Sequence, residues 1–184
     1  KRNKTLYDYN VNMLRTTSEC MSGILGGADT ICNLPYDALY HKDNDFAERI
    51  SRNQLILLKE ESYFENIAHV TNGAFYIESL THQLAQKALA LFKQIEASGG
   101  FLKALETGKI QQKIKESALK EQTLFDAGET ILLGTNAYQD SNDRMKGTLE
   151  LYPFTKNRSE KTKIIPIIEK RWAEEMEQKR LDNE

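Results

Sequence analysis

Long apolar runs, secretion signals and an excess of one charge are all missing from this sequence. No stretch approaches the roughly 18 to 20 apolar residues that a membrane-spanning helix requires, and the first residues contain no hydrophobic signal core. Lysine and arginine (25) nearly balance aspartate and glutamate (27), which leaves a formal charge of −2. This balance gives no electrostatic reason to expect a nucleic acid or a membrane as partner.

Cysteine is also scarce. The two cysteines, Cys20 and Cys32, lack the spacing of a metal site, and two thiols do not make a disulfide framework. We therefore expect a reducing compartment, the cytoplasm. The sequence contains no dinucleotide-binding fingerprint, no phosphate loop and no nucleophile elbow. The sequence therefore gives no sign of a common nucleotide-binding site or of a serine hydrolase site.

What the sequence does contain is a series of helical patterns. Apolar residues at three- and four-residue steps predict helices over residues 10–24, 76–97, 101–105, 110–125 and 165–176, and another that Asp43 or Asn44 caps. Pro166 suits the first turn of the last helix. Residues 28–32 and 130–133 have the composition of two short strands. The polar stretch 136–159 is predicted to be an extended connection.

Each pattern also predicts which side chains are buried. The long helix over residues 76–97 has the clearest apolar stripe, so we expect one of its sides to be covered along its whole length. The expected inner faces are, in chain order, Val11, Leu14, Met21 and Ile24; Phe46, Ile50 and Leu57; Ile77, Leu80, Leu84, Leu91 and Ile95; Ile110, Ile114, Ala118 and Leu124; and Ile165, Ile168, Trp172 and Met176. Leu149, Leu151, Tyr152 and Phe154 are expected to dock the extended connection.

Several sequence blocks follow one another in an order that is informative as a whole. They are N-M-L-R-T (12–16), L-G-G (25–27), D-N-D-F-A-E-R-I-S-R-N (43–53), G-A-F-Y-I-E-S-L-T (73–81), G-G-F-L-K-A-L-E-T-G (99–108) and L-L-G-T-N-A-Y (132–138). In this order the chain resembles the methylmalonyl-CoA mutase family of cobalamin-dependent acyl-CoA mutases. It is most similar to the small, non-catalytic subunit of that family, from Thr5 to about Tyr138.

The resemblance implies a mainly α fold with minor β structure: the last strand-helix units of a (β/α)8 barrel, followed by a helical connector. It divides the chain into a barrel portion (1–66), a connector (67–138), an extended linker (139–162) and a C-terminal amphipathic helix (163–184). A complete barrel needs roughly 250 residues, so we expect these 184 residues to be a piece of a larger protein. Uncovered strand edges and apolar surface then favour self-association of the isolated chain.

The resemblance also identifies where this chain departs from catalytic members of the family. Aligned backwards from R-I-S-R-N, Ala38 stands where they carry a glutamate that faces the cofactor, and Cys32 where they carry a histidine. A methyl group neither accepts a hydrogen bond nor carries charge. No catalytic residue is therefore assigned. Asn33, Tyr36 and Asp37 remain candidates for substrate binding, with a turn or capping role as the alternative for Asp37.

The cobalt-ligating pattern of the family, Asp-x-His-x-x-Gly, is not present. The residues two positions before His41, His69 and His82 are Leu39, Ile67 and Leu80. We therefore expect no metal and no cofactor on this chain, with adenosylcobalamin in the partner subunit. Three arginines could pair with coenzyme A phosphates or, alternatively, with neighbouring acids; they are Arg15, Arg49 and Arg52.

The resemblance implies a subunit of an adenosylcobalamin-dependent mutase that interconverts methylmalonyl-CoA and succinyl-CoA. This chain would supply structure and contacts to the large catalytic subunit, and alone it would be inactive. A different class of protein stays open as the alternative: an independent helical module that binds partner proteins through its amphipathic helices. A catalytic subunit with an altered site is disfavoured by Ala38.

Overall fold

The computed structural model describes residues 2–67, 69–156 and 162–184. Its helices are α1 (Val11–Leu25), α2 (Asp45–Ile56), α3 (Phe75–Ala97), α4 (Gly100–Glu106), α5 (Lys109–Asp126) and α6 (Glu174–Asp182), with a short π-helical turn η1 (Leu57–Glu61) and a 3-10 turn η2 (Phe64–Asn66). The prediction of a mainly helical chain is confirmed. Four helices, α1, α3, α4 and α5, begin and end within about one residue of the predicted positions, and α2 begins directly after its predicted cap.

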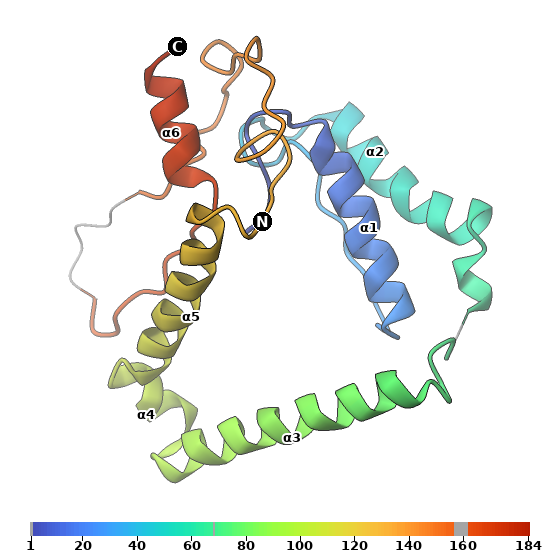
Figure 1. The fold of residues 1–184 in the computed structure, drawn as a ribbon, viewed down its shortest axis with the longest axis vertical. Coiled ribbons are helices and arrows are strands. Elements are labelled where there is room, and N and C mark those ends of the chain that lie inside the picture. The colour runs from blue at the N-terminus through green and yellow to red at the C-terminus, as the bar shows by residue number, and fades with distance from the viewer. Residues whose placement is uncertain (1, 68, 157–161) are drawn as a thin grey trace.

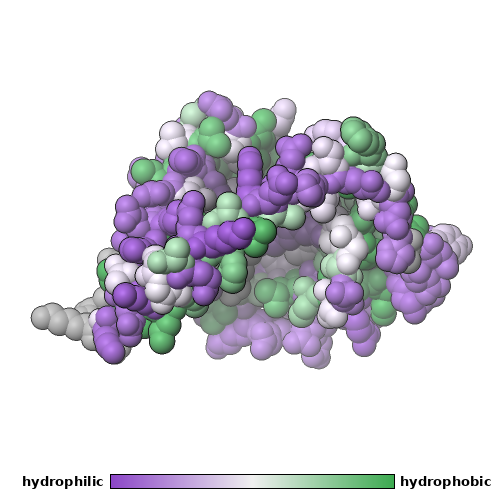
Figure 2. Space-filling model, turned by 90° about the horizontal axis from the view of Figure 1, so that it is seen from below, coloured by the Kyte–Doolittle hydropathy of each residue, from purple (hydrophilic) through white to green (hydrophobic). Residues whose placement is uncertain are grey.

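The helices form an open ring rather than stacked layers (Figure 1). α1 packs with α2 on one side, α4 packs with α5 on the other, and α3 crosses between the two sides and packs with α4. α6 and the N-terminal residues lie at the end of the ring opposite α3 (Figure 1). Seen from below, hydrophobic side chains gather on the walls of a hollow in the molecule (Figure 2).

The two predicted strands are wrong for this structure, because no strand forms in the described ranges. Residues 28–32 are irregular, and residues 130–133 contribute only an isolated bridge between Leu133 and Ala137. A strand this short needs a neighbouring strand to pair with. Residues 30–36 instead lie along α1, where Ile31 packs at 3.0 Å from the position a Cβ would take on Gly23.

The buried face of α1 is polar. Asn12, Thr16 and Cys20 are buried at four-residue spacing, whereas Leu14 and Met21 of the predicted apolar stripe are exposed. The predicted apolar stripe of α1 is therefore wrong. Small polar side chains occupy the inner face because they bond to the backbone of the N-terminal residues and to α2.

α2 begins as predicted, with Asn44 as its N-cap. The Asn44 side-chain oxygen accepts a hydrogen bond from the Ala47 N–H at 2.9 Å, which satisfies one of the unpaired donors of the first turn. Ala47 and Ser51 form the buried face, whereas Phe46 and Leu57 of the predicted inner face are exposed. The start of the helix is confirmed and its predicted inner face is wrong.

Apart from its C-terminal end, which packs against α4, α3 is uncovered in the described part of the chain. The helix has no buried residue, and Leu84 and Phe92 are 60% and 57% exposed. The helix is confirmed, but the prediction that one side is buried is wrong for this chain alone. The inner face predicted for α5 is also wrong: Ile114 and Leu124 are exposed, whereas Gln111 and Phe125 are buried.

The last helix starts later than predicted. Residues 162–173 are irregular, and α6 begins at Glu174. Two side chains of α5 donate hydrogen bonds to backbone carbonyls of this irregular segment. Gln111 donates to the Ile165 oxygen at 3.0 Å, and Gln122 donates to the Trp172 oxygen at 3.1 Å. These bonds hold the segment extended along α5. Of the predicted inner face, Ile165, Ile168 and Met176 are exposed and Trp172 is half-buried.

Two small clusters hold the chain together at this end. The larger cluster joins the N-terminus to the segment after α5, and its buried members are Leu6, Tyr7, Tyr40, Met145 and Phe154; Leu149 packs against it. The smaller cluster consists of Phe125, Leu132 and Ala173. The predicted docking of the extended connection is confirmed for Leu149 and Phe154, whereas Leu151 and Tyr152 remain exposed.

Candidate functional site

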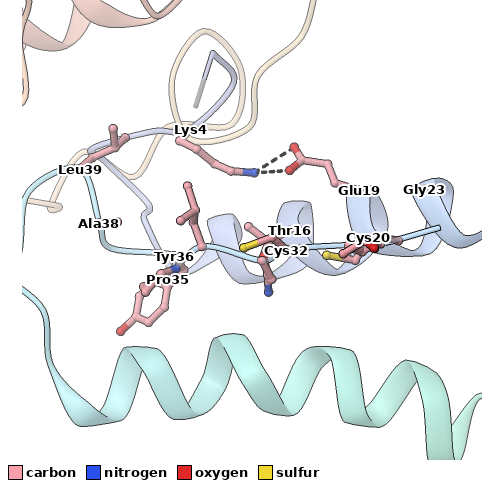
Figure 3. Close-up of a pocket in the computed structure, with 14 residues that line it drawn as sticks. Lys4, Thr16, Glu19, Cys20, Gly23, Cys32, Pro35, Tyr36, Ala38 and Leu39 are labelled. Atoms are coloured by element: carbon pink, nitrogen blue, oxygen red, sulfur yellow. Dashed lines mark hydrogen bonds and ion pairs between the residues drawn. The ribbon is translucent and has the colours of Figure 1, made fainter. Parts of the chain in front are cut away.

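An open groove of about 350 Å³ lies between α1 and residues 30–39. Figure 3 shows α1 along one wall, the irregular segment along the other, and the Lys4–Glu19 ion pair at the rim. Its lining includes Cys20, Cys32, Asn33, Tyr36 and Ala38. The groove thus brings together four of the positions singled out from the sequence: Cys32, Asn33, Tyr36 and Ala38.

A glutamine of α2 holds the two walls together. The Gln54 amide nitrogen donates to the Thr16 and Thr17 hydroxyls at 2.9 and 2.7 Å, and to the Met13 carbonyl. Its oxygen accepts from the Asn33 side chain at 2.7 Å. Gln54 was missed at the sequence level, although it follows Ala47 and Ser51 at helical spacing on the buried face of α2. Asn33 is therefore used in packing, which leaves it no free donor for a ligand.

Tyr36 is buried at the end of the groove. Its ring stacks on Tyr9 with 6.2 Å between ring centroids, and its carbonyl accepts a bond from the Asn12 side chain at 3.2 Å. Burial, followed by the nearby Asp37 charge, raises the pKa of the Tyr36 hydroxyl. The phenol is therefore a neutral group at physiological pH, which favours a packing or donor role.

Asp37 is buried but does not line the groove. One oxygen of its carboxylate contacts the His41 ring nitrogen Nδ1 at 3.2 Å and accepts from the Asn44 side chain at 2.9 Å. Its backbone oxygen accepts from Tyr40 and His41. This geometry is that of the turn and capping role, which was the alternative for Asp37. The side chains of Asn33 and Asp37 thus form internal hydrogen bonds in this structure, and their role in substrate binding stays a prediction.

The side chains that line the groove include few reactive groups. Ala38 contributes a half-buried methyl group, and burial raises the pKa of the Cys20 thiol, which favours its unreactive form. At the rim, burial acts to raise the pKa of Glu19, but hydrogen bonds from Lys4 and Asn3 outweigh burial and lower it. The only ionised groups at the groove therefore neutralise each other.

The arginines considered for phosphate binding are differently placed. Arg15 donates to the Thr5 hydroxyl at 2.9 Å, to Asn12 at 2.8 Å and to the Leu133 carbonyl at 2.8 Å. Arg49 and Arg52 are exposed on α2. Arg15 is thus used in internal hydrogen bonds. No described residue combines with Arg49 or Arg52 to form an anion-binding site.

The described residues contain no group of three or more histidine, cysteine, aspartate or glutamate side chains that could hold a metal ion. The groove contains no imidazole, because His41 bonds elsewhere and His69 and His82 are exposed on other segments. The residues present therefore do not fit a cobalt cofactor bound through histidine, and we assign no step to one. None of the described helices is both long enough and apolar enough to span a membrane.

Comparison with known proteins identifies the family. A model of the methylmalonyl-CoA mutase family matches residues 1–183. The chain belongs to the methylmalonyl-CoA mutase family. It is 37% identical to the methylmalonyl-CoA mutase small subunit of Porphyromonas gingivalis over 182 residues, which cover 99% of this chain and 29% of that protein. The resemblance seen in the ordered sequence blocks is confirmed.

Two other relatives match a shorter part of the chain. The methylmalonyl-CoA mutase large subunit of Porphyromonas gingivalis is 34% identical over 128 residues, or 70% of this chain and 18% of that protein. The methylmalonyl-CoA mutase of Escherichia coli is 36% identical over 140 residues, or 76% of this chain and 20% of that protein. The chain thus spans less than a third of the length of these relatives.

Proposed function

We propose that this chain is part of the small subunit of an adenosylcobalamin-dependent methylmalonyl-CoA mutase, an isomerase of the cytoplasm, and that its role there is assembly. One observation carries the proposal: the small subunit of Porphyromonas gingivalis is 37% identical over 99% of the chain, whereas the large subunit of the same organism is 34% identical over 70%. The substrate pair would be methylmalonyl-CoA and succinyl-CoA. The partner would be the large subunit.

In the whole protein, residues 1–66 would belong to the end of a (β/α)8 barrel, followed by the connector (67–138), the linker (139–162) and the C-terminal segment (163–184). The uncovered side of α3 supports this arrangement. The apolar side of an amphipathic helix is normally covered, and here Phe75, Leu84 and Phe92 are exposed. Residues 28–32 would then pair with strands that the isolated chain lacks.

Ala38 supports the non-catalytic assignment. Its methyl group lines the groove, where it offers no hydrogen bond and no charge. Adenosylcobalamin supplies the radical chemistry in this family, and it would be held by the partner subunit. The chain alone is expected to have no mutase activity. The alternative, a helical interaction module without a mutase role, explains the exposed apolar side of α3 but not the family match over nearly the whole chain.

The test is affinity capture of the full-length protein from its native extract, followed by a cobalamin-dependent assay that converts methylmalonyl-CoA. We expect a larger mutase chain to be captured with it, and activity to require that chain. Turnover by the captured protein without a second chain would refute the non-catalytic assignment. Capture of other proteins with no mutase among them would favour the interaction module.

The isolated chain is expected to self-associate into a dimer or larger assembly, because α3 presents large apolar side chains to water. Light scattering over a range of protein concentrations measures this. Leu84→Gln on α3, at a 60% exposed position, should lower the average mass. Leu119→Gln on α5, at a 69% exposed position, is the matched control and should not. A compact monomer at high concentration would contradict the prediction.

A further inference from the structure

The sequence contains a single asparagine-glycine pair, Asn72–Gly73, and the structure places it in the turn that leads into α3. This turn lies at a corner of the open ring (Figure 1). Asn72 and Gly73 are both exposed. Apart from the chain neighbours of Gly73, no atom lies within 4 Å of the position that a Cβ would take on it. The peptide bond between the two residues is therefore open on the side of Gly73.

The backbone nitrogen of Gly73 and the side chain of Asn72 can react with each other. The nitrogen attacks the side-chain carbonyl carbon, and the new C–N bond closes a cyclic imide. The bond from that carbon to the side-chain nitrogen breaks, and ammonia leaves with a proton that replaces the one lost from the attacking nitrogen. Water then opens the imide at either carbonyl, which leaves an aspartate or an isoaspartate at position 72. Glycine favours the attack, because no Cβ crowds its nitrogen.

Glu78, in the first turn of α3, contacts the proton that the attacking nitrogen must release. Its carboxylate accepts a hydrogen bond from the Gly73 N–H at 2.8 Å. A general base has to lie within hydrogen-bond reach of the proton it removes, about 2.6 to 3.2 Å between heavy atoms, and Glu78 meets this condition. The Glu78 N–H in turn donates to the Ala74 carbonyl at 3.0 Å, which fixes its backbone. The start of α3 thus presents a base to the nitrogen of Gly73.

We propose that Asn72 is a site of spontaneous deamidation, in which the Gly73 nitrogen is the nucleophile and the Glu78 carboxylate accepts its proton. The product carries a carboxylate in place of a neutral amide, just before the N-terminus of α3. Negative charge is favourable near the N-terminus of a helix, so α3 should persist after the reaction. The isoaspartate product also lengthens the backbone of the turn by one methylene group. The inference does not depend on a mutase role for the chain.

The measurement is incubation of the intact chain near neutral pH over several weeks, followed by proteolytic digestion and mass spectrometry of the asparagine peptides. Deamidation changes the peptide mass, and the aspartate and isoaspartate products elute separately. Asn142 is the matched control, because it is also exposed in a turn but precedes Asp143. We expect Asn72 to react at least about 10-fold faster than Asn142, since a side chain on the following residue hinders the attack. Equal rates at the two positions, or no reaction at Asn72, would overturn the proposal.

Three variants test the roles of the individual groups. Asn72→Gln keeps an amide but would have to close a larger ring, so the modified peptides should disappear. Glu78→Gln keeps an acceptor for the Gly73 N–H but cannot take up its proton, so the reaction at Asn72 should slow several-fold. Glu96→Gln removes the same charge from an exposed position near the other end of α3 and should leave the rate unchanged. Equal rates in Glu78→Gln and Glu96→Gln would overturn the role of Glu78 as the base.

Discussion

Replacing Glu177 with glutamine is expected to lower the free energy of unfolding by about 3 to 5 kcal/mol. The side chains of Glu177 and Arg171 form an ion pair and are only 1% and 6% exposed. The other Glu177 oxygen accepts from the Leu6 N–H at 2.7 Å, and Arg171 also donates to the Lys4 carbonyl at 3.1 Å. The amide of glutamine cannot accept from both partners, so a buried guanidinium or a buried N–H is left unpaired. Thermal or urea unfolding measures the loss.

A neighbouring ion pair provides the matched control. Lys170 and Glu175 also lie in contact at 2.6 Å, but their side chains are 48% and 66% exposed. Because an exposed pair contributes little, Lys170→Met should change stability by less than about 1 kcal/mol. The double variant Arg171→Met with Glu177→Leu removes both buried charges and should recover part of the loss. A loss for Glu177→Gln no larger than that of Lys170→Met would refute the importance of the buried pair.

The helices could be predicted from the sequence because the signals that start and stop a helix are local. Asn44 caps α2, and glycines with positive φ lie at the ends of α1, α4 and α5, among them Gly27, Gly108 and Gly128. The buried faces could not be predicted, because burial depends on partners. The apolar stripe of α3 is real in the sequence, but within the described residues only its C-terminal end is packed, against α4. The strand at residues 28–32 fails for the same reason.

The site could be located but not interpreted from the sequence. The segment around Asn33, Tyr36 and Ala38 does form one wall of the groove beside α1. The hydrogen bonds of these side chains could not be predicted, because they join residues that are apart in the sequence. Asn33 bonds to Gln54 on α2, and Asp37 bonds to His41. The buried pair of Arg171 and Glu177 was missed, because charged residues near a chain end resemble a solvated helix face.

Replacing Asn12 with leucine is expected to destabilise the chain by at least about 3 kcal/mol, because each buried polar group left unpaired costs about 1 to 3 kcal/mol. Asn12 is completely buried. Its oxygen accepts from the Thr5 N–H at 3.0 Å and from Arg15 at 2.8 Å, and its nitrogen donates to the carbonyls of Thr5 and Tyr36 at 2.8 and 3.2 Å. Leucine has a similar volume but satisfies none of these groups. Urea unfolding of the purified variant measures the difference.

Two further variants test whether the bonds of Asn12, rather than its position in α1, cause the loss. Ser18→Ala alters an exposed residue of the same helix and should change stability by no more than about 0.5 kcal/mol. Asn12→Asp keeps the acceptors for Thr5 and Arg15 but places an oxygen against the carbonyls of Thr5 and Tyr36, so its loss should also exceed that of Ser18→Ala. If Asn12→Leu were as stable as Ser18→Ala, the network would not matter. If the losses follow the expected order, the N-M-L-R-T block has a structural role. The buried amide of its first residue, Asn12, connects the N-terminal residues, α1 and the groove segment.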